Sequence, residues 1–233
     1  MIVVIGDLGL RGTIDEPEPD GLASEIAAAA AAAGARVELI SKAGDDPAGD
    51  AVLLALAAAG VGHVATLRDP ARLTPIRARP DEPTDPADPR LDTLDASRPA
   101  SDAGTSSVED ESVAAARPIA ARPPAAARPT LDAADIALAL QYLNDFEVLV
   151  AVHPSSDLLA ESVSAAGWTG ARLVVVLEPD GKVPAGLPAD ALVVAAGADD
   201  TGIGARIGRY AAALSRGDDA AAAYRDLTAA PTA

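Results

Sequence analysis

The sequence contains no cysteine, and aromatic residues make up only 2% of its 233 residues. The missing cysteines exclude disulfide bonds and thiol chemistry. Because 49% of the residues are hydrophobic and so few are aromatic, the interior must consist of alanine and aliphatic side chains on closely packed helices. The length allows one α/β domain with a substantial core, or two small domains.

Positive charge is also scarce. Lys and Arg number 18 against 35 Asp and Glu, which gives a formal net charge of −17. This balance argues against general affinity for nucleic acid or for an anionic membrane, since both need a basic surface. The opening residues 1–7 lack the positively charged region of a signal peptide, and their apolar run is too short to span a bilayer. We therefore expect a cytoplasmic protein with neither nucleic acid nor membrane as a partner.

Residues 34–61 predict a strand, a tight turn and a helix in direct succession. The apolar strand covers residues 37–41, and the turn that follows it ends at Asp46. An aspartate is a preferred helix N-cap, and Pro47 suits the first helical position. The simplest interpretation of Asp45 and Asp46 is therefore as turn and capping residues.

The rest of the chain predicts further alternation of strands and helices, which is typical of a parallel sheet with helices on both faces. The expected strands are residues 2–5, 61–67, 146–152, 172–177 and 191–195, and the expected helices are residues 21–34, 47–59, 132–143, 155–166 and 203–214.

Gly6, Gly9 and Gly12 follow the first strand at a spacing that resembles a dinucleotide-binding loop. Residues 13–20 (TIDEPEPD) nevertheless contain two prolines and four acidic side chains. Prolines prevent a helix from starting at the glycines, and the carboxylates repel phosphate. We expect a flexible crossing here, with a nicotinamide-binding Rossmann protein kept as a third hypothesis.

Residues 69–130 contain 11 of the 19 prolines and no aromatic residue. Such a segment buries too little apolar surface to offset its ordering entropy, so it predicts a disordered Pro/Ala-rich insert. The predicted organisation is one domain in two parts, residues 1–68 and 131–230, around this insert. The alternative is a regulatory or docking segment, in which Arg117, Arg122 and Arg128 form a weak basic ligand.

His153 follows the predicted strand 146–152 at its carboxyl end, where open α/β sheets place their sites. A histidine directly before a proline is more often a cap or a surface residue than a catalyst. We keep both interpretations.

The block from the glycine at 34 through GDDPAG to the helix ending in AGV resembles the N-terminal region of the ribokinase (PfkB-type) carbohydrate kinases. The resemblance covers residues 1–64 and, more loosely, 131–230. It implies a three-layer, Rossmann-like α/β sandwich, a shortened ribokinase fold. It also implies transfer of phosphate from ATP, with Mg²⁺, to a hydroxyl of a sugar or nucleoside.

The resemblance also assigns roles to residues near the end of the chain. Thr201, Gly202 and Gly204 match the turn that forms an anion hole for the transferred phosphoryl group, at a helix N-terminus. The catalytic aspartate of the family falls on Ala205, so the catalytic base is missing. Loss of a general base lowers a rate by roughly 10²–10⁴.

On the substrate side, Gly21, Asp45 and Asp46 are the candidate residues. The sugar-binding aspartate of the family falls on Arg11, and an asparagine at the start of the helix falls on Glu25. Exchanging an acceptor for a guanidinium reverses the local hydrogen-bonding role. The sequence therefore predicts a carbohydrate-kinase-like protein with impaired or absent activity. The alternative is a non-catalytic scaffold that binds a nucleotide, a metabolite or a protein, and the oligomeric state is not predicted.

Overall fold

We describe the protein from a computed structural model, which covers residues 1–79, 128–196 and 202–228. These residues belong to one compact unit. Within these ranges, no helix is long and apolar enough to cross a membrane. The middle of the predicted insert, residues 80–127, lies outside the described residues.

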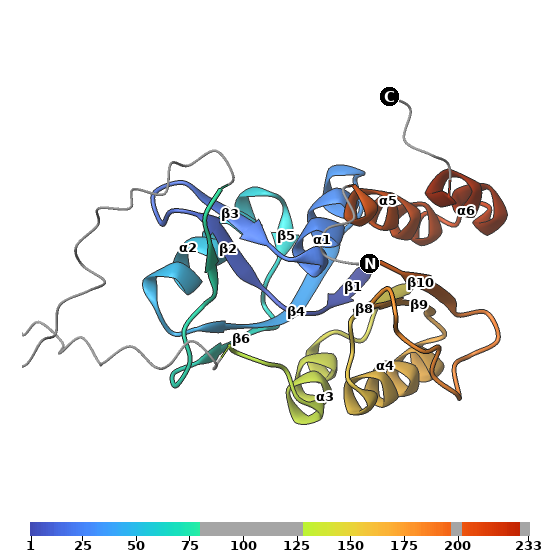
Figure 1. Ribbon diagram of the computed structural model, residues 1–233. Helices are drawn as coiled ribbons and strands as arrows, with labels where there is room; N and C mark the ends of the chain where they lie inside the picture. Colours follow the sequence, from blue (N-terminus) through green and yellow to red (C-terminus); the bar gives the residue numbers. More distant parts are fainter. Residues whose placement is uncertain (80–127, 197–201, 229–233) are drawn as a thin grey trace, which may run out of the picture. The chain divides into compact units, whose positions relative to one another are not determined.

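A seven-stranded parallel sheet forms the centre of this unit (Figure 1). Its main path runs in the order β10-β9-β8-β1-β4-β5, and β6 pairs with the second half of β4. The paired strands are all parallel. The strands are β1 (Ile2–Ile5), β4 (Val37–Gly44), β5 (Val61–Gly62), β6 (Thr66–Asp69), β8 (Val148–Val152), β9 (Arg172–Leu177) and β10 (Leu192–Ala195).

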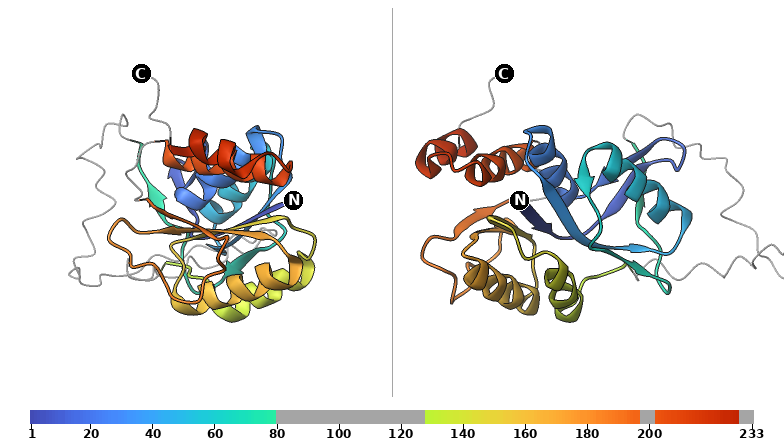
Figure 2. Two further views of the ribbon diagram at one scale, coloured as in Figure 1. Left: turned by 90° about the vertical axis from the view of Figure 1, so that its right-hand side faces the viewer. Right: turned by 180° about the vertical axis from the view of Figure 1, so that it is seen from behind.

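Helices cover both faces of the sheet, which gives the three layers seen edge-on in Figure 2. One face carries α1 (Leu22–Ala32), α2 (Pro47–Ala58), α5 (Ile203–Ser215) and α6 (Ala220–Thr228). The other face carries α3 (Ala133–Tyr142) and α4 (Ser156–Thr169). The α/β three-layer architecture expected from the sequence is confirmed.

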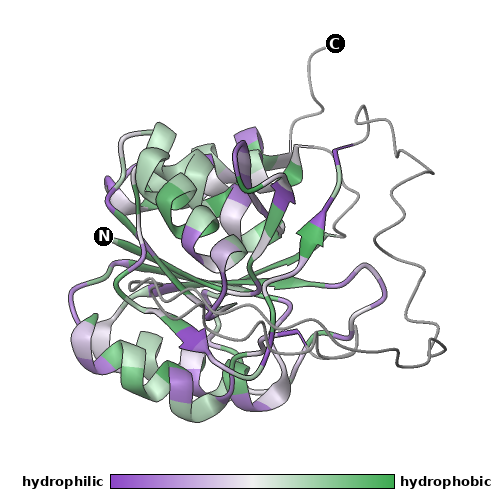
Figure 3. Cartoon of the chain, turned by 90° about the vertical axis from the view of Figure 1, so that its left-hand side faces the viewer, coloured by the Kyte–Doolittle hydropathy of each residue, from purple (hydrophilic) through white to green (hydrophobic). Residues whose placement is uncertain are grey.

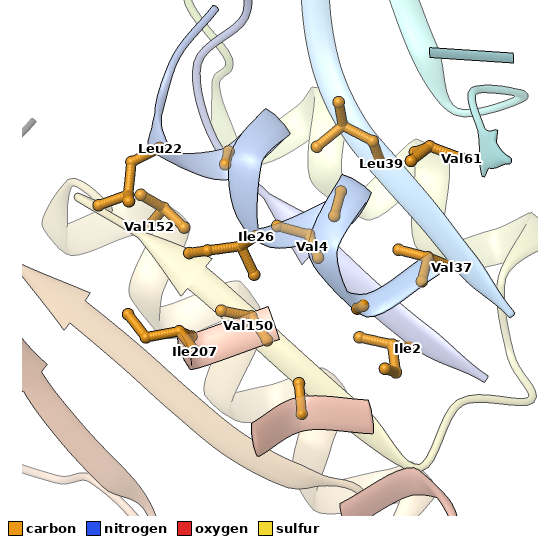
Figure 4. Close-up of a cluster of buried hydrophobic side chains, with 14 of the residues drawn as sticks. Ile2, Val4, Leu22, Ile26, Val37, Leu39, Val61, Val150, Val152 and Ile207 are labelled. Atoms are coloured by element: carbon orange, nitrogen blue, oxygen red, sulfur yellow. The ribbon is translucent and has the colours of Figure 1, made fainter. Parts of the chain in front are cut away.

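The two-residue period of the strands divides the core between the two faces. In β1, Ile2 and Val4 join the cluster beneath α1 and α5, whereas Val3 and Ile5 join the cluster above α3 and α4. Figure 4 shows the first cluster, and Figure 3 colours the central strands predominantly as hydrophobic. Because both faces of β1 are buried, its sequence is continuously apolar rather than alternating.

A second, three-stranded sheet lies beyond the carboxyl end of β1. It consists of β2 (Gly9–Gly12), β3 (Pro17–Asp20) and β7 (Ile76–Arg77) in the order β3-β2-β7. The flexible crossing expected between the first strand and the first helix is therefore wrong, because residues 9–12 and 17–20 pair as an antiparallel hairpin. A dinucleotide-binding loop would require a helix directly after Gly12, and the backbone there does not form one.

Several boundaries differ from the sequence expectations. Residues 69–79, assigned to the insert, contain β7 and a buried Thr74 whose hydroxyl accepts from the Gly44 N–H at 2.9 Å. The single strand expected at residues 61–67 is split into β5 and β6. Helix α6 was not expected, because alanine and polar residues there give little apolar pattern.

Helices α1 and α5 lie unusually close together because α5 presents two glycines to α1. A Cβ on Gly208 would lie 2.5 Å from the carbonyl oxygen of Ile26. A Cβ on Gly204 would lie 2.8 Å from the Cβ of Glu25. The spacing of four residues puts both glycines on one face of α5, so this face can approach the α1 backbone directly.

Candidate functional site

The topology reverses direction between β1 and β8. From β1 the chain passes through α1 to β4 on one side, whereas β8 pairs with the other edge of β1 and leads into α4 on the opposite face. In open α/β sheets, ligands bind in the crevice outside the carboxyl ends of the strands at such a switch point. Residues that follow β1 and β8 are therefore the first candidates for a site.

A pocket of about 220 Å³ occupies this position. We call it the switch-point pocket. Its floor comes from the residues after β1, β8 and β9, its side from the start of α1, and its cover from the β2-β3-β7 sheet. Its polar and glycine lining includes Asp7, Gly9, Asp20, Gly21, Arg77, Arg128, His153 and Glu178.

Close backbone packing forms the base of the pocket. Gly6 follows β1, and a Cβ there would lie 2.7 Å from the Cβ of Ala23 and 3.1 Å from the Cβ of Val152. The buried Ser41 hydroxyl donates to the Gly6 carbonyl at 2.7 Å, which fixes the end of β1. Gly21 is the N-cap of α1 with φ 107°, a value that suits glycine. The sequence-predicted Gly21 thus lies in the pocket wall.

His153 has the one positive φ, 46°, found at a non-glycine residue among the described residues. Its ring lies between two oxygens: Nε2 is 2.9 Å from the Ala196 carbonyl, and Nδ1 is 3.2 Å from the Glu178 carboxylate. His153 thereby connects the ends of β8, β9 and β10 at the pocket, and such strained backbone positions cluster at functional sites.

Ion pairs join the three strands of the cover to one another. The Asp20 carboxylate in β3 accepts from Arg11 in β2 at 2.7 and 3.1 Å, and the Nε of Arg77 in β7 lies 3.4 Å from its other oxygen. The hydrogen bond to Asp20 raises the pKa of the Arg11 guanidinium, with help from the nearby carboxylate of Glu25. The Arg11 guanidinium is thus engaged within the protein.

The start of α5 is the second part of the candidate site. Gly202 is its N-cap with φ 77°, and no side chain of the described residues caps the helix. Gly204 and Ala205 follow in the first turn, and Thr201 lies outside the described residues. The Glu25 carboxylate from α1 lies against this turn, with Oε2 2.9 Å from the Cβ position of Gly204. The backbone N–H groups of this turn favour an anion, whereas the nearby Glu25 carboxylate opposes one.

Asp45 and Asp46 lie beside α2 and do not line the pocket. Asp46 is the N-cap of α2, and its carboxylate accepts from the backbone N–H groups of Gly49 and Thr74, both at 2.7 Å. Asp45 has a 65% exposed side chain, 3.7 Å from Arg68. Both aspartates have structural surroundings, and a substrate role for them remains a prediction.

The described residues offer little else as a site. They include no group of three or more His, Cys, Asp or Glu side chains arranged to hold a metal ion. A larger hollow of about 720 Å³ lies between α5 and α6, with arginines and aspartates in similar number. Its walls are helix sides rather than strand ends, so we favour the smaller switch-point pocket.

Sequence reasoning missed Asp7, Arg77 and Glu178 as pocket residues and gave His153 only an open role. Asp7, His153 and Glu178 each come within two residues of the end of a parallel strand. The carboxyl ends of parallel strands meet at one edge of the sheet. A search for polar residues just after the predicted strands would therefore have found Asp7, His153 and Glu178. Arg77 could not be found, because its place depends on a strand inside the predicted insert.

No family model matches the chain, and no curated protein matches it either. Solved structures do match. A putative ribokinase II from E. coli, in its apo form, is 15% identical, with a TM-score of 0.57, covering 97% of this chain and 89% of that chain.

Two further structures show weaker similarity. An uncharacterized sugar kinase from Pyrococcus horikoshii is 14% identical (TM-score 0.44), covering 75% of this chain and 52% of that chain. A fructokinase from Xylella fastidiosa with bound ATP is 16% identical (TM-score 0.46), and the match covers 97% of this chain and 64% of that chain. The chain spans about half the length of the Pyrococcus enzyme.

At this level of identity the similarity concerns the fold. The chain has the fold of the ribokinase-type sugar kinases, in a shortened form.

Proposed function

We propose that this chain is a carbohydrate-kinase-like protein that binds a small polyhydroxylated molecule, a sugar or nucleoside, in the switch-point pocket and transfers phosphate poorly or not at all. The observation that carries this proposal is the first turn of α5. There Ala205 stands where the resemblance to the carbohydrate kinases expects the catalytic base, and the Glu25 carboxylate lies near Gly204.

The pocket suits a neutral ligand with several hydroxyl groups. Its lining combines acceptors, the Asp7 and Glu178 carboxylates, with donors such as the Arg77 guanidinium. A hydroxyl both donates and accepts, so a polyol can satisfy both kinds of group. The volume of about 220 Å³ is smaller than that of most drug-sized sites, roughly 300–1,000 Å³. A single sugar ring therefore fits better than a long ligand.

ATP with Mg²⁺ is the cofactor implied by the fold, and the residues fit it only in part. The uncapped N-terminus at Gly202 favours an anion. The Glu25 carboxylate opposes one, and the described residues hold no carboxylate cluster for a metal.

The alternative is a non-catalytic scaffold that binds a metabolite or a protein partner. It uses the same pocket without any phosphate donor, and the missing base favours it over an efficient kinase. The nicotinamide-binding hypothesis is not retained, because residues 9–12 and 17–20 are strands. A cytoplasmic location remains a prediction from the sequence.

A direct test measures phosphate transfer from ATP, with Mg²⁺, to a panel of sugars and nucleosides. We expect the native protein to match a no-protein blank. A variant with Ala205→Asp and Glu25→Gln restores a carboxylate base and removes the opposing charge, and we expect it to exceed the blank. Transfer by the native protein that Gly202→Val abolishes would contradict an impaired site.

A further inference from the structure

Glu25 brings an acidic side chain of α1 to the N-terminus of another helix, α5. We infer that Glu25 is a specificity-determining residue that excludes phosphate groups from the first turn of α5. This inference rests on the proposed function, in which the N-terminus of α5 is the part of the site that favours an anion.

The Glu25 side chain lies between β2 and the start of α5. Glu25 is in the first turn of α1, and its Oε2 is 2.9 Å from the position that a Cβ on Gly204 would occupy. Its Oε1 lies 3.6 Å from the Arg11 Nη2, and 40% of the side chain is exposed. Because Gly204 has no side chain, α1 approaches α5 closely enough for this placement.

The charge of α5 explains why the contact matters. A helix N-terminus carries a partial positive charge that acts within the first turn and favours a negative group. Among the described residues, no side chain caps α5, and its first turn contains no acidic residue. Glu25 is an acidic group supplied by another helix. A phosphate that entered here would meet the Glu25 carboxylate.

Replacing the carboxylate by an amide of the same shape tests this inference. We expect Glu25→Gln to gain a concentration-dependent rise in unfolding temperature with millimolar inorganic phosphate, since a ligand bound only to the folded state stabilises it. Phosphate also stabilises proteins without binding, by exclusion from their surface. Glu161→Gln on α4 makes the same charge change in the other helical layer and measures that background.

The native protein and Glu161→Gln should show only the background rise, and Glu25→Gln should exceed it. Glu25→Asn, with a shorter amide, serves if the glutamine variant does not fold. An equal response of all three proteins would overturn the inference. The sugar-binding part of the proposed function is judged separately, by unfolding with neutral sugars, so the two can fail independently.

Discussion

At the scale of single residues, the structure separates structural aspartates from pocket residues. Asp46 follows the N-cap rule and accepts two backbone hydrogen bonds, whereas Asp45 points into solvent near Arg68. We expect Asp46→Ala to lower the free energy of unfolding by about 1–2 kcal/mol. Asp45→Ala should change it little, because an exposed ion pair contributes about 0–1 kcal/mol. Urea unfolding of both variants measures the difference, and equal losses would contradict the capping role.

Two variants of His153 separate the effect of its backbone conformation on stability from the effect of its ring contacts. His153→Ala and His153→Gly both remove the contacts to Ala196 and Glu178, but only glycine accepts a φ of 46° without strain. We expect the glycine variant to be more stable than the alanine variant by about 1 kcal/mol. A sugar that raises the unfolding temperature of the native protein should not raise that of either variant, as measured by thermal unfolding. An alanine variant as stable as the glycine variant would mean that the site is unstrained.

At the scale of elements, the two glycines of α5 decide how closely it packs on α1. We expect Gly208→Ala to destabilise the protein by about 1–3 kcal/mol, because its Cβ would meet the α1 backbone at Ile26. Gly167→Ala in α4 is the matched control, since nothing lies within 4 Å of its Cβ position. There the higher helix propensity of alanine should stabilise the protein by up to about 1 kcal/mol. Chemical unfolding of both variants would show opposite signs, and a stabilising Gly208→Ala would contradict the close contact.

Local patterns were enough to predict most elements but not the parts that depend on distant pairing. The helix after Asp46 and the strand at residues 2–5 carry their own signals, namely a cap with proline and a continuous apolar run. The strands at residues 9–12 and 17–20 do not, because the first contains two glycines, the second contains two prolines and two acidic residues, and both depend on pairing with each other. Glu25 and Gly204, far apart in the sequence, become neighbours only through helix packing.

At the scale of the whole molecule, the chain has the ribokinase-type fold with a pocket at its switch point, and the proposed function depends on the charges around the start of α5. Arg11 pairs with Asp20, and the Glu25 carboxylate lies near Gly204. We propose that the pocket accepts a small polar ligand and that the start of α5 disfavours a phosphate donor.

The most direct test of this account is the unfolding temperature of the native protein with neutral sugars and nucleosides, and separately with ATP and Mg²⁺. A ligand bound to the folded state raises this temperature with its concentration. The account predicts a rise with at least one neutral polyhydroxylated compound and no specific rise with millimolar ATP. A clear rise with ATP, and none with any neutral compound, would contradict it.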